Sequence, residues 1–317
     1  MKAVVYSEYG TPDVLELQDV DKPSQKEDEV LIRVRATSVN ASDWEFLTGK
    51  PFYARMFGLF KPGFNILGSD FAGVVEAVGS NVTEFQPNDE VLGDIMRTLG
   101  GFAEYVCAPE SVLAKSDGVS FSEAATLPQA ATVALQAIRD KGKVREGHRV
   151  LVNGAGGSVG TFAVQIAKLY GAEVCAVDHG SKLDMLRSIG ADTVIDYTKT
   201  DFSQLDEPFD FILDIVGNRS ISDLRRSLSA SGIYSVVGGR VLEALFIGSL
   251  VSLFSKKSMG ILAWKPNRLD LEYVVELCRK GIIRPVIDAE YELNELQIAL
   301  NKLGARKTLG IGVVTQT

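Results

Sequence analysis

Cysteine and histidine are scarce in this sequence, which holds three cysteines and two histidines in 317 residues. Cys107, Cys175 and Cys278 are odd in number and far apart, so they predict no disulfide framework and favour a reducing compartment. Zinc is held in proteins by sets of three or four side chains, mostly Cys and His. Because the few cysteines and histidines lie in separate segments, the sequence predicts no metal site.

Long hydrophobic runs and basic clusters are also lacking. The most apolar run, residues 244–254, is far shorter than the roughly 20 residues that cross a bilayer. The first ten residues show neither the apolar stretch nor the cleavage site of a secretory signal. A net charge of −8 disfavours nucleic acid and anionic membranes as partners, because both repel an acidic protein. We therefore expect a cytoplasmic protein without a membrane span, whose partner is a small molecule.

The chain contains two successive patterns. Up to about residue 122, short alternating apolar runs are separated by Gly, Pro, Asn and Asp, which predicts a mostly antiparallel β domain. Six short apolar runs then alternate with amphipathic segments, which predicts an α/β fold with a doubly wound parallel sheet. Because six strands complete such a sheet, we expect the elements after residue 266 to rejoin the β domain. The predicted domains are residues 1–122 with 267–317, and residues 123–266; the six predicted strands lie in residues 148–154, 173–178, 192–196, 209–217, 232–239 and 258–264.

A glycine-rich turn, LVNGAGGSVG, joins the first of these strands to a helix. Gly154 allows the tight turn, Gly157 lets the backbone approach a pyrophosphate, and Gly160 lets the helix pack closely against the sheet. The helix N-terminus, which begins with Ser158 and Val159, presents free N–H groups and positive dipole charge to phosphates. The strand, the turn and the helix together predict a dinucleotide site.

The residues after the second strand point to two different dinucleotides. The strand ends at Asp178, and an acid at this place usually bonds the ribose 2′-hydroxyl of NAD(H). His179, Ser181 and Lys182 follow at once, and together they can hold the 2′-phosphate of NADP(H). Tyr197, at the end of the third strand, is a candidate contact on the adenine side. These residues alone leave both dinucleotides open.

Several long blocks occur in a familiar order along the chain: ATSVNASDW, ILGSDFAGVVEAVGSNVTEFQPNDEVLG, GGFAEYV, AATLPQAATVALQAI, VLVNGAGGSVGTFAVQIAK, LRSIGADTVIDY and DFILDIVGN. With these blocks the chain resembles the medium-chain dehydrogenase/reductase superfamily, and within it the quinone oxidoreductase branch. The resemblance covers nearly the whole chain. It implies a GroES-like β-rich substrate domain interrupted by a Rossmann domain, with the active site in the cleft between them.

The resemblance also indicates where this chain departs from zinc alcohol dehydrogenases. Those relatives bind catalytic zinc through a Cys in the segment matching VNASD and a His in the segment matching GSD. Asn40 and Ser69 stand at those places here, and Asp70 replaces the neighbouring Glu. The lobe that carries four cysteines for a structural zinc is also absent from the sequence. We therefore expect the protein to work without zinc.

Without zinc, the expected reaction is hydride transfer from NAD(P)H to a quinone or a conjugated enone or enal, whose own carbonyl delocalises the charge. The protein then supplies position, a dry pocket and hydrogen bonds. Asn40 is the first candidate donor to the substrate oxygen or the nicotinamide ribose. Asp43 belongs to the same local network, and Tyr53 is a second candidate donor. The alternatives are that Asn40 caps a turn and that Tyr53 is an ordinary loop aromatic.

Further cofactor contacts are expected where strands end. Thr132 matches the family's threonine near the nicotinamide. Val216 and Gly217 end the fourth strand, and Gly238 and Gly239 end the fifth, at the edge where ligands lie in such sheets. The family, together with the lysine after the second strand, favours NADP(H), with NAD(H) as the alternative.

Two other functions stay open. A regulatory or structural protein would bind the dinucleotide without turnover. An enoyl-thioester reductase would need a basic entrance for a phosphopantetheine arm, and the sequence shows no cluster of that kind. Relatives often form homodimers by joining the edge strands of two sheets, and the apolar run 258–264 predicts the same here.

Overall fold

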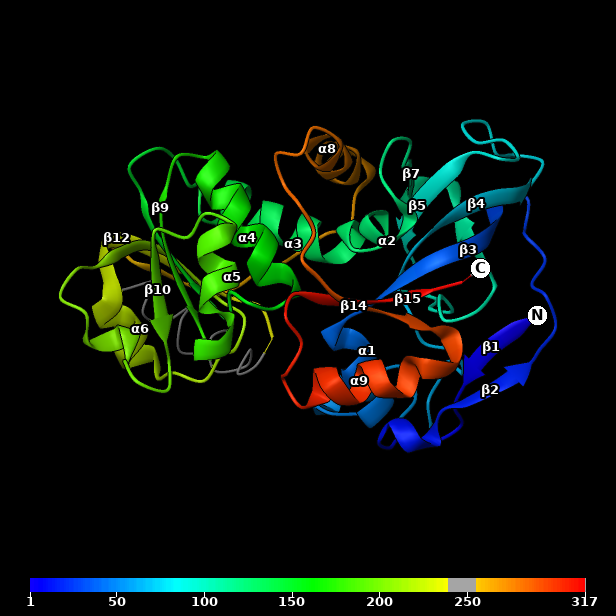
Figure 1. The fold of residues 1–317 in the computed structure, drawn as a ribbon, viewed down its shortest axis with the longest axis horizontal. Coiled ribbons are helices and arrows are strands. Elements are labelled where there is room, and N and C mark those ends of the chain that lie inside the picture. The colour runs from blue at the N-terminus through cyan, green and yellow to red at the C-terminus, as the bar shows by residue number, and fades with distance from the viewer. Residues whose placement is uncertain (239–254, 317) are drawn as a thin grey trace. The chain divides into compact units, whose positions relative to one another are not determined.

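The computed structural model describes residues 1–238 and 255–316, and its contacts divide the chain into two compact units (Figure 1). The β-rich unit comprises Met1–Gln129 and Pro266–Thr317, and the α/β unit comprises Ala130–Lys265. Two of the positions considered above, Gly239 and the apolar run 244–254, lie outside the described residues.

The β-rich unit is built on a seven-stranded sheet in which β14, β15, β3, β4, β5 and β7 follow one another and β6 pairs with β3. The last strand of the chain, β15, runs antiparallel to β3, with Gly312 opposite Val39, so segments from both ends of the sequence lie side by side (Figure 1). A separate antiparallel pair is formed by β1 and β2. The strand bounds are β1 Lys2–Val5, β2 Glu16–Asp19, β3 Glu29–Val39, β4 Asp70–Val78, β5 Glu90–Asp94, β6 Tyr105–Pro109, β7 Leu113–Lys115, β14 Ile287–Glu292 and β15 Ile311–Thr315.

Short helices connect or cover these strands. The first, α1, begins after Asn40, which forms a capping box with Asp43, and ends at Gly49, whose φ of +62° suits only glycine well. A second, α2, packs on β3, β4 and β15, so this unit continues past residue 122 to Gln129. The helix bounds are α1 Ala41–Thr48, α2 Phe121–Ala124, α8 Arg268–Arg279 and α9 Leu296–Gly304, with single turns at η1 Pro12–Val14, η2 Phe52–Arg55, η3 Glu110–Val112 and η8 Leu293–Glu295.

The α/β unit confirms the predicted doubly wound sheet. Its six strands are all parallel and lie in the order β10, β9, β8, β11, β12, β13. Helix α4 packs on β8 and β9, α5 on β10, and α6 on β12. The strand bounds are β8 Arg149–Asn153, β9 Glu173–Asp178, β10 Thr193–Asp196, β11 Phe209–Asp214, β12 Leu228–Val236 and β13 Ser258–Ile261. The helix bounds are α3 Thr132–Leu135, α4 Ser158–Leu169, α5 Leu183–Ser188 and α6 Ile221–Ser227, with single 3-10 turns at η6 Gly180–Lys182 and η7 Phe202–Gln204. Two π-helical segments flank α3, η4 Leu127–Ala131, which begins in the β-rich unit, and η5 Gln136–Lys141.

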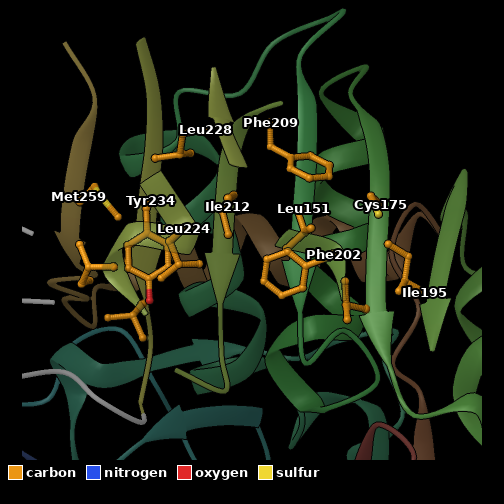
Figure 2. Packing of buried hydrophobic residues seen from close by; sticks show 13 residues of the cluster. Leu151, Cys175, Ile195, Phe202, Phe209, Ile212, Leu224, Leu228, Tyr234 and Met259 are labelled. Carbon is orange, nitrogen blue, oxygen red and sulfur yellow. The ribbon is translucent and has the colours of Figure 1, made fainter. Parts of the chain in front are cut away.

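One row of buried side chains crosses this sheet. Residues opposite one another in parallel strands point to the same face, and the register places Cys175, Leu151, Ile212, Tyr234 and Met259 in one line across β9, β8, β11, β12 and β13. All five are at most 3% exposed, and Figure 2 shows them packed with other members of the same cluster. Burial on both faces explains why these strands read as continuous apolar runs rather than alternating ones. This core fixes where the carboxyl ends of the strands lie.

No helix within residues 1–238 and 255–316 has the length and apolarity of a membrane span.

Candidate functional site

The glycine loop lies between β8 and α4 and is closed by backbone contacts. Gly154, with a φ of +84°, donates its N–H to the Val177 carbonyl, as does Ala155, at 3.0 and 3.1 Å. A Cβ on Gly160 would lie 2.4 Å from the Gly154 carbonyl oxygen, so only glycine lets α4 approach the loop this closely. A Cβ on Gly157 would have only that same oxygen near it, at 3.5 Å. The loop therefore has the tight turn, the close helix and the open backbone that a pyrophosphate requires.

Asp178 fastens the end of β9 to this loop. Its carboxylate accepts hydrogen bonds from the Gly156 N–H at 2.8 Å and from the His179 N–H at 2.7 Å. Lys182 Nζ lies 3.5 Å from the same carboxylate, and both side chains are nearly buried. The stem of Lys182 crosses the loop so closely that a Cβ on Gly156 would lie 2.5 Å from Lys182 Cδ. The acid and the base that pointed to different dinucleotides thus form an ion pair.

The other residues that the sequence singled out near Asp178 gather beside it. The His179 ring accepts a hydrogen bond at Nδ1 from the Ser181 N–H at 3.2 Å, and the Ser181 hydroxyl lies 3.0 Å from the same nitrogen. Tyr197, about half exposed, presents its ring edge-on to His179 with 6.1 Å between the ring centres. Because the Asp178 carbonyl accepts the Tyr197 N–H, the ends of β9 and β10 are held together. The side chains of Ser181, Lys182 and Tyr197 therefore line one polar edge.

The turn after β11 is held by a carboxylate that sequence reasoning missed. Asp214, the last residue of β11, accepts hydrogen bonds from the N–H groups of Val216 and Gly217 at 3.0 and 2.8 Å. Asp214 is the second Asp of the block DFILDIVGN, but its hydrogen-bond partners are visible only in the fold. Gly217 and Gly238 both have positive φ angles, +62° and +83°, as expected for turns at strand ends.

Thr132 lies in the first helix of the α/β unit, and its hydroxyl has a partner. The Trp264 ring donates its Nε1–H to Thr132 Oγ1 at 3.1 Å. Lys265, the residue after Trp264, is bonded by the side-chain amide of Gln136. The Gln136 oxygen accepts the Lys265 N–H at 3.0 Å, and the Gln136 nitrogen donates to the Lys265 carbonyl at 2.7 Å. The position of Thr132 is thereby tied to the segment in which the chain leaves this unit.

Asn40 lies in a buried polar cluster of the β-rich unit. Its amide nitrogen donates to Ser38 Oγ at 3.0 Å and to the Asp70 carboxylate at 3.1 Å, which uses both of its hydrogens. The same carboxylate accepts from the Ser69 hydroxyl at 3.2 Å and from the Gln129 N–H at 3.0 Å. In this arrangement Asn40 caps α1 and braces Asp70, and its role as a donor to the substrate oxygen or the nicotinamide ribose stays a prediction.

Asp43 and Tyr53 occupy different surroundings. Asp43 is wholly buried, and its carboxylate accepts the Asn40 N–H at 2.8 Å and the Gly68 N–H at 3.1 Å. Burial raises the pKa of Asp43 to about 7. Tyr53 is 43% exposed, and its hydroxyl donates to Glu45 at 2.9 Å. Asp43 is therefore a brace between α1 and the start of β4, whereas Tyr53 belongs to the exposed loop that follows α1.

A second buried carboxyl, Asp94, lies beside Asp70 in this cluster. Asp70 and Asp94 are opposite one another in the β4–β5 pair. Burial raises the pKa of Asp70, and the neighbouring Asp94 raises it further. Burial also raises the pKa of Asp94, to about 6; one of its oxygens accepts the Met96 N–H at 2.7 Å, and the other has no hydrogen-bond partner among the described residues. A buried oxygen in this state favours the protonated carboxyl.

The donor set at this place does not suit zinc. Zinc prefers thiolates and imidazoles, whereas Asn40 presents a donating amide and Ser69 a hydroxyl already bonded to Asp70. Within the parts of the chain that the structure describes, no three His, Cys, Asp or Glu side chains are grouped so as to hold a metal ion. No step of the chemistry below passes through a metal.

Two family models match this chain, one within the β-rich unit and one that runs from the α/β unit into the last part of the β-rich unit. A family described as "Alcohol dehydrogenase GroES-like domain" matches residues 26–118, and one described as "Zinc-binding dehydrogenase" matches residues 189–314. A quinone-oxidoreductase homolog, chloroplastic, of Spinacia oleracea is 31% identical, over 96% of this chain and 94% of its own length.

Two other proteins are similar. An NADPH-dependent alkenal/one oxidoreductase, chloroplastic, of Arabidopsis thaliana is 40% identical over 68% of this chain, and the match spans 58% of that relative's length. The solved structure of the quinone oxidoreductase from Coxiella burnetii has a TM-score of 0.91 and 29% identity, covering 100% of this chain and 99% of that one.

The raised pKa of Asp94 predicts a pH-dependent effect of Asp94→Asn. Between the ordinary value of 3.8 and about 6, the folded protein keeps a proton that the unfolded chain releases, so the free energy of unfolding falls as the pH rises through this window. Asparagine keeps an oxygen for Met96 and carries no charge. Relative to the wild-type protein, we expect the variant's free energy of unfolding to be higher at about pH 8 than at about pH 4.5 by about 1–2 kcal/mol, measured by urea unfolding. Asp21→Asn, at an exposed site of the same unit, is the control; an equal gain at both pH values would contradict the expectation.

Proposed function

Because the chain belongs to the medium-chain dehydrogenase/reductase superfamily, in its quinone oxidoreductase-like branch, we propose that it reduces its acceptor with a dinucleotide held at the glycine loop and without zinc. The protein is an NAD(P)H-dependent oxidoreductase that acts on quinones or conjugated enones or enals, as the names of its relatives support. The observation that carries the cofactor assignment is the glycine loop closed onto β9 by Asp178. The residues proposed to bind the dinucleotide all belong to the α/β unit by sequence.

The α/β unit would bind the dinucleotide along the carboxyl ends of its strands. Gly154, Gly157 and Gly160 would admit the pyrophosphate, and the first turn of α4, with Ser158 and Val159, would bond it, because the N–H groups there have no partner within the helix. The adenosine ribose would meet Asp178, Ser181 and Lys182, with Tyr197 on the adenine side. Thr132, Val216, Gly217, Gly238 and Gly239 are proposed contacts of the nicotinamide half.

When bound, the reduced nicotinamide supplies the hydride, and the acceptor's carbonyl delocalises the charge that arrives with it. The chain's own residues then have to position the acceptor and exclude water. Asn40 and Asp43 are proposed to keep the shape of the polar site, because their hydrogen bonds join α1 to β4. Tyr53 is the proposed donor to the acceptor oxygen, since the residue is 43% exposed and its hydroxyl donates to a single side chain among the described residues, Glu45 of α1.

A turnover assay tests the whole proposal. Purified protein is expected to oxidise NADPH or NADH, followed at the nicotinamide absorbance band, with quinones and conjugated enones, and to show little oxidation of simple alcohols with the oxidised dinucleotide. A strong chelator should leave the rate unchanged, since residues 1–238 and 255–316 group no three His, Cys, Asp or Glu side chains that could hold a metal ion. Failure to bind either dinucleotide would sink the proposal. Tight binding without turnover of any acceptor would instead favour the regulatory or structural alternative.

NADP(H) is the proposed cofactor, because Lys182 lies at the ribose end and can leave Asp178 for a 2′-phosphate. Lys182→Ala is expected to weaken NADPH binding about tenfold while NADH binding stays within about threefold, as for loss of one charge-assisted hydrogen bond. Lys168→Ala is the matched control, because that lysine pairs with Asp192 at 2.8 Å at the other end of α4. Both affinities are measured by fluorescence titration. If NADPH and NADH affinity fell equally, Lys182 would not determine the preference between the two dinucleotides.

A homodimer is proposed through β13. This strand is the last of its sheet among the described residues, and an apolar edge strand favours pairing with a second copy. Light scattering is expected to give twice the chain mass of 34.3 kDa, whereas the mass of one chain across the working concentrations would rule the dimer out. The cytoplasmic location stays a prediction, and the names of two plant relatives place those proteins in chloroplasts.

A further inference from the structure

Asp214 is a wholly buried carboxylate in which every oxygen is engaged. One oxygen accepts three hydrogen bonds, from Asn153 Nδ2 at 2.8 Å and from the N–H groups of Val216 and Gly217 at 3.0 and 2.8 Å. The other oxygen accepts the Tyr234 hydroxyl at 3.1 Å. A buried charge is costly unless it is surrounded by donors, and four donors converge here. A buried carboxylate with four donors is therefore expected to have a structural or functional role, rather than merely to occupy space in the core.

The carboxylate lies where the strand order of the sheet changes direction. From β8 the chain continues to β9 on one side, whereas β11 lies on the other, so the gap between β8 and β11 is the switch point of the sheet. Asn153 ends β8, Asp214 ends β11, and the two are opposite one another in the register. In open parallel sheets, ligands lie just beyond the carboxyl ends of the strands at this point. Asp214 thus joins three strands, β8, β11 and β12, directly beneath the ligand edge.

The turn held by Asp214 also touches the glycine loop. A Cβ placed on Gly154 would meet Val216 Cγ2 at 3.0 Å and Ile215 Cβ at 3.3 Å. The Ile215 N–H bonds the Asn153 carbonyl at 2.9 Å, so the turn is fastened to the residue that precedes the loop. The turn is therefore hydrogen-bonded beside the start of the loop, and it leaves little room for a side chain at Gly154. These contacts connect the end of β8 with the turn after β11, and the two residues bonded there, Asn153 and Asp214, are 61 residues apart in the sequence.

We propose that Asp214 is a positioning residue for the dinucleotide: it holds the 215–217 turn and the glycine loop in one fixed arrangement. The inference rests on the proposed function, because it assumes that a dinucleotide lies at this edge. Asp214 itself does not touch the cofactor, since it is wholly buried beneath the turn. We expect its effect to be larger on the pyrophosphate and nicotinamide half, because the hydrogen bonds of Asp214 go to Asn153, Tyr234 and the 215–217 turn, whereas Asp178 and Lys182 pair with each other at the adenosine end.

Three variants test this role. Asp214→Leu leaves the four donors without an acceptor and is expected to weaken NADPH and NADH binding about tenfold or more. Asp214→Asn is expected to rescue binding to within about threefold of wild type, because the amide oxygen can keep the three donors and the amide nitrogen can donate to Tyr234. Asp210→Leu is the matched control: it lies on the same strand at the opposite end, where Asp210 accepts the Arg149 N–H at 3.0 Å and the Ser229 hydroxyl at 2.9 Å.

A fragment separates positioning from general stability. Adenosine 2′,5′-bisphosphate carries only the adenosine end, so its affinity should change less than about threefold in Asp214→Leu while that of NADPH falls. Equal losses for fragment and cofactor, or the same loss in Asp210→Leu, would overturn the inference. If Asp214→Leu does not fold, Asn153→Ala decides, because it removes only the bond beside the loop; unchanged NADPH affinity there would also overturn it. Wild-type protein that binds neither dinucleotide would overturn the proposed function and the inference together.

Discussion

A buried carboxylate that accepts backbone N–H groups is the interaction on which the loops of both units depend. In the α/β unit, Asp178 holds the glycine loop and Asp214 holds the turn after β11. In the β-rich unit, Asp43 joins the start of α1 to Gly68, and Asp70 accepts hydrogen bonds from Ser38 of β3, from Asn40 just before α1 and from the N–H of Gln129. Each carboxylate binds segments distant in sequence. An oxygen that accepts two or three donors fixes a loop in one place, which a hydrophobic contact cannot do.

The features of the α/β unit that local sequence encodes were predictable. The glycine spacing, the strand before it and the helix after it involve neighbouring residues, and Gly154 and Gly160 lie where the spacing indicated. The six strands were also recognisable as short apolar runs, most clearly β8, β9 and β11, which are buried almost throughout. Their parallel order followed from the alternation with helices. Asp178 was found because it ends such a run.

What the sequence could not reveal are partners set by topology. Asn153 and Asp214 meet only because β8 and β11 are neighbours, and nothing near either residue indicates this. The sequence predicts Asn40 as a donor to the substrate oxygen or the nicotinamide ribose, or as a turn cap, and it does not show that both amide hydrogens have partners inside the protein, Ser38 and Asp70. The acid and the base after β9 were read as rivals, although they are bonded to each other. In these cases the hydrogen-bond or ion-pair partner of each side chain follows from the fold and not from the neighbouring sequence.

The path of the Lys182 side chain bears on how such a protein can diverge. Its stem crosses the loop where Gly156 has no side chain, with only 2.5 Å between Lys182 Cδ and the place a Cβ would occupy. A side chain at position 156 would therefore displace the end of Lys182 and would also meet the Asp178 carboxylate, whose nearer oxygen lies 3.0 Å from the same place. Loss of the glycine and loss of the lysine would each break the ion pair, so either order of mutation passes through a form in which Asp178 stands without its lysine. Divergence at this loop would then have to cross a form in which that carboxylate is unpaired.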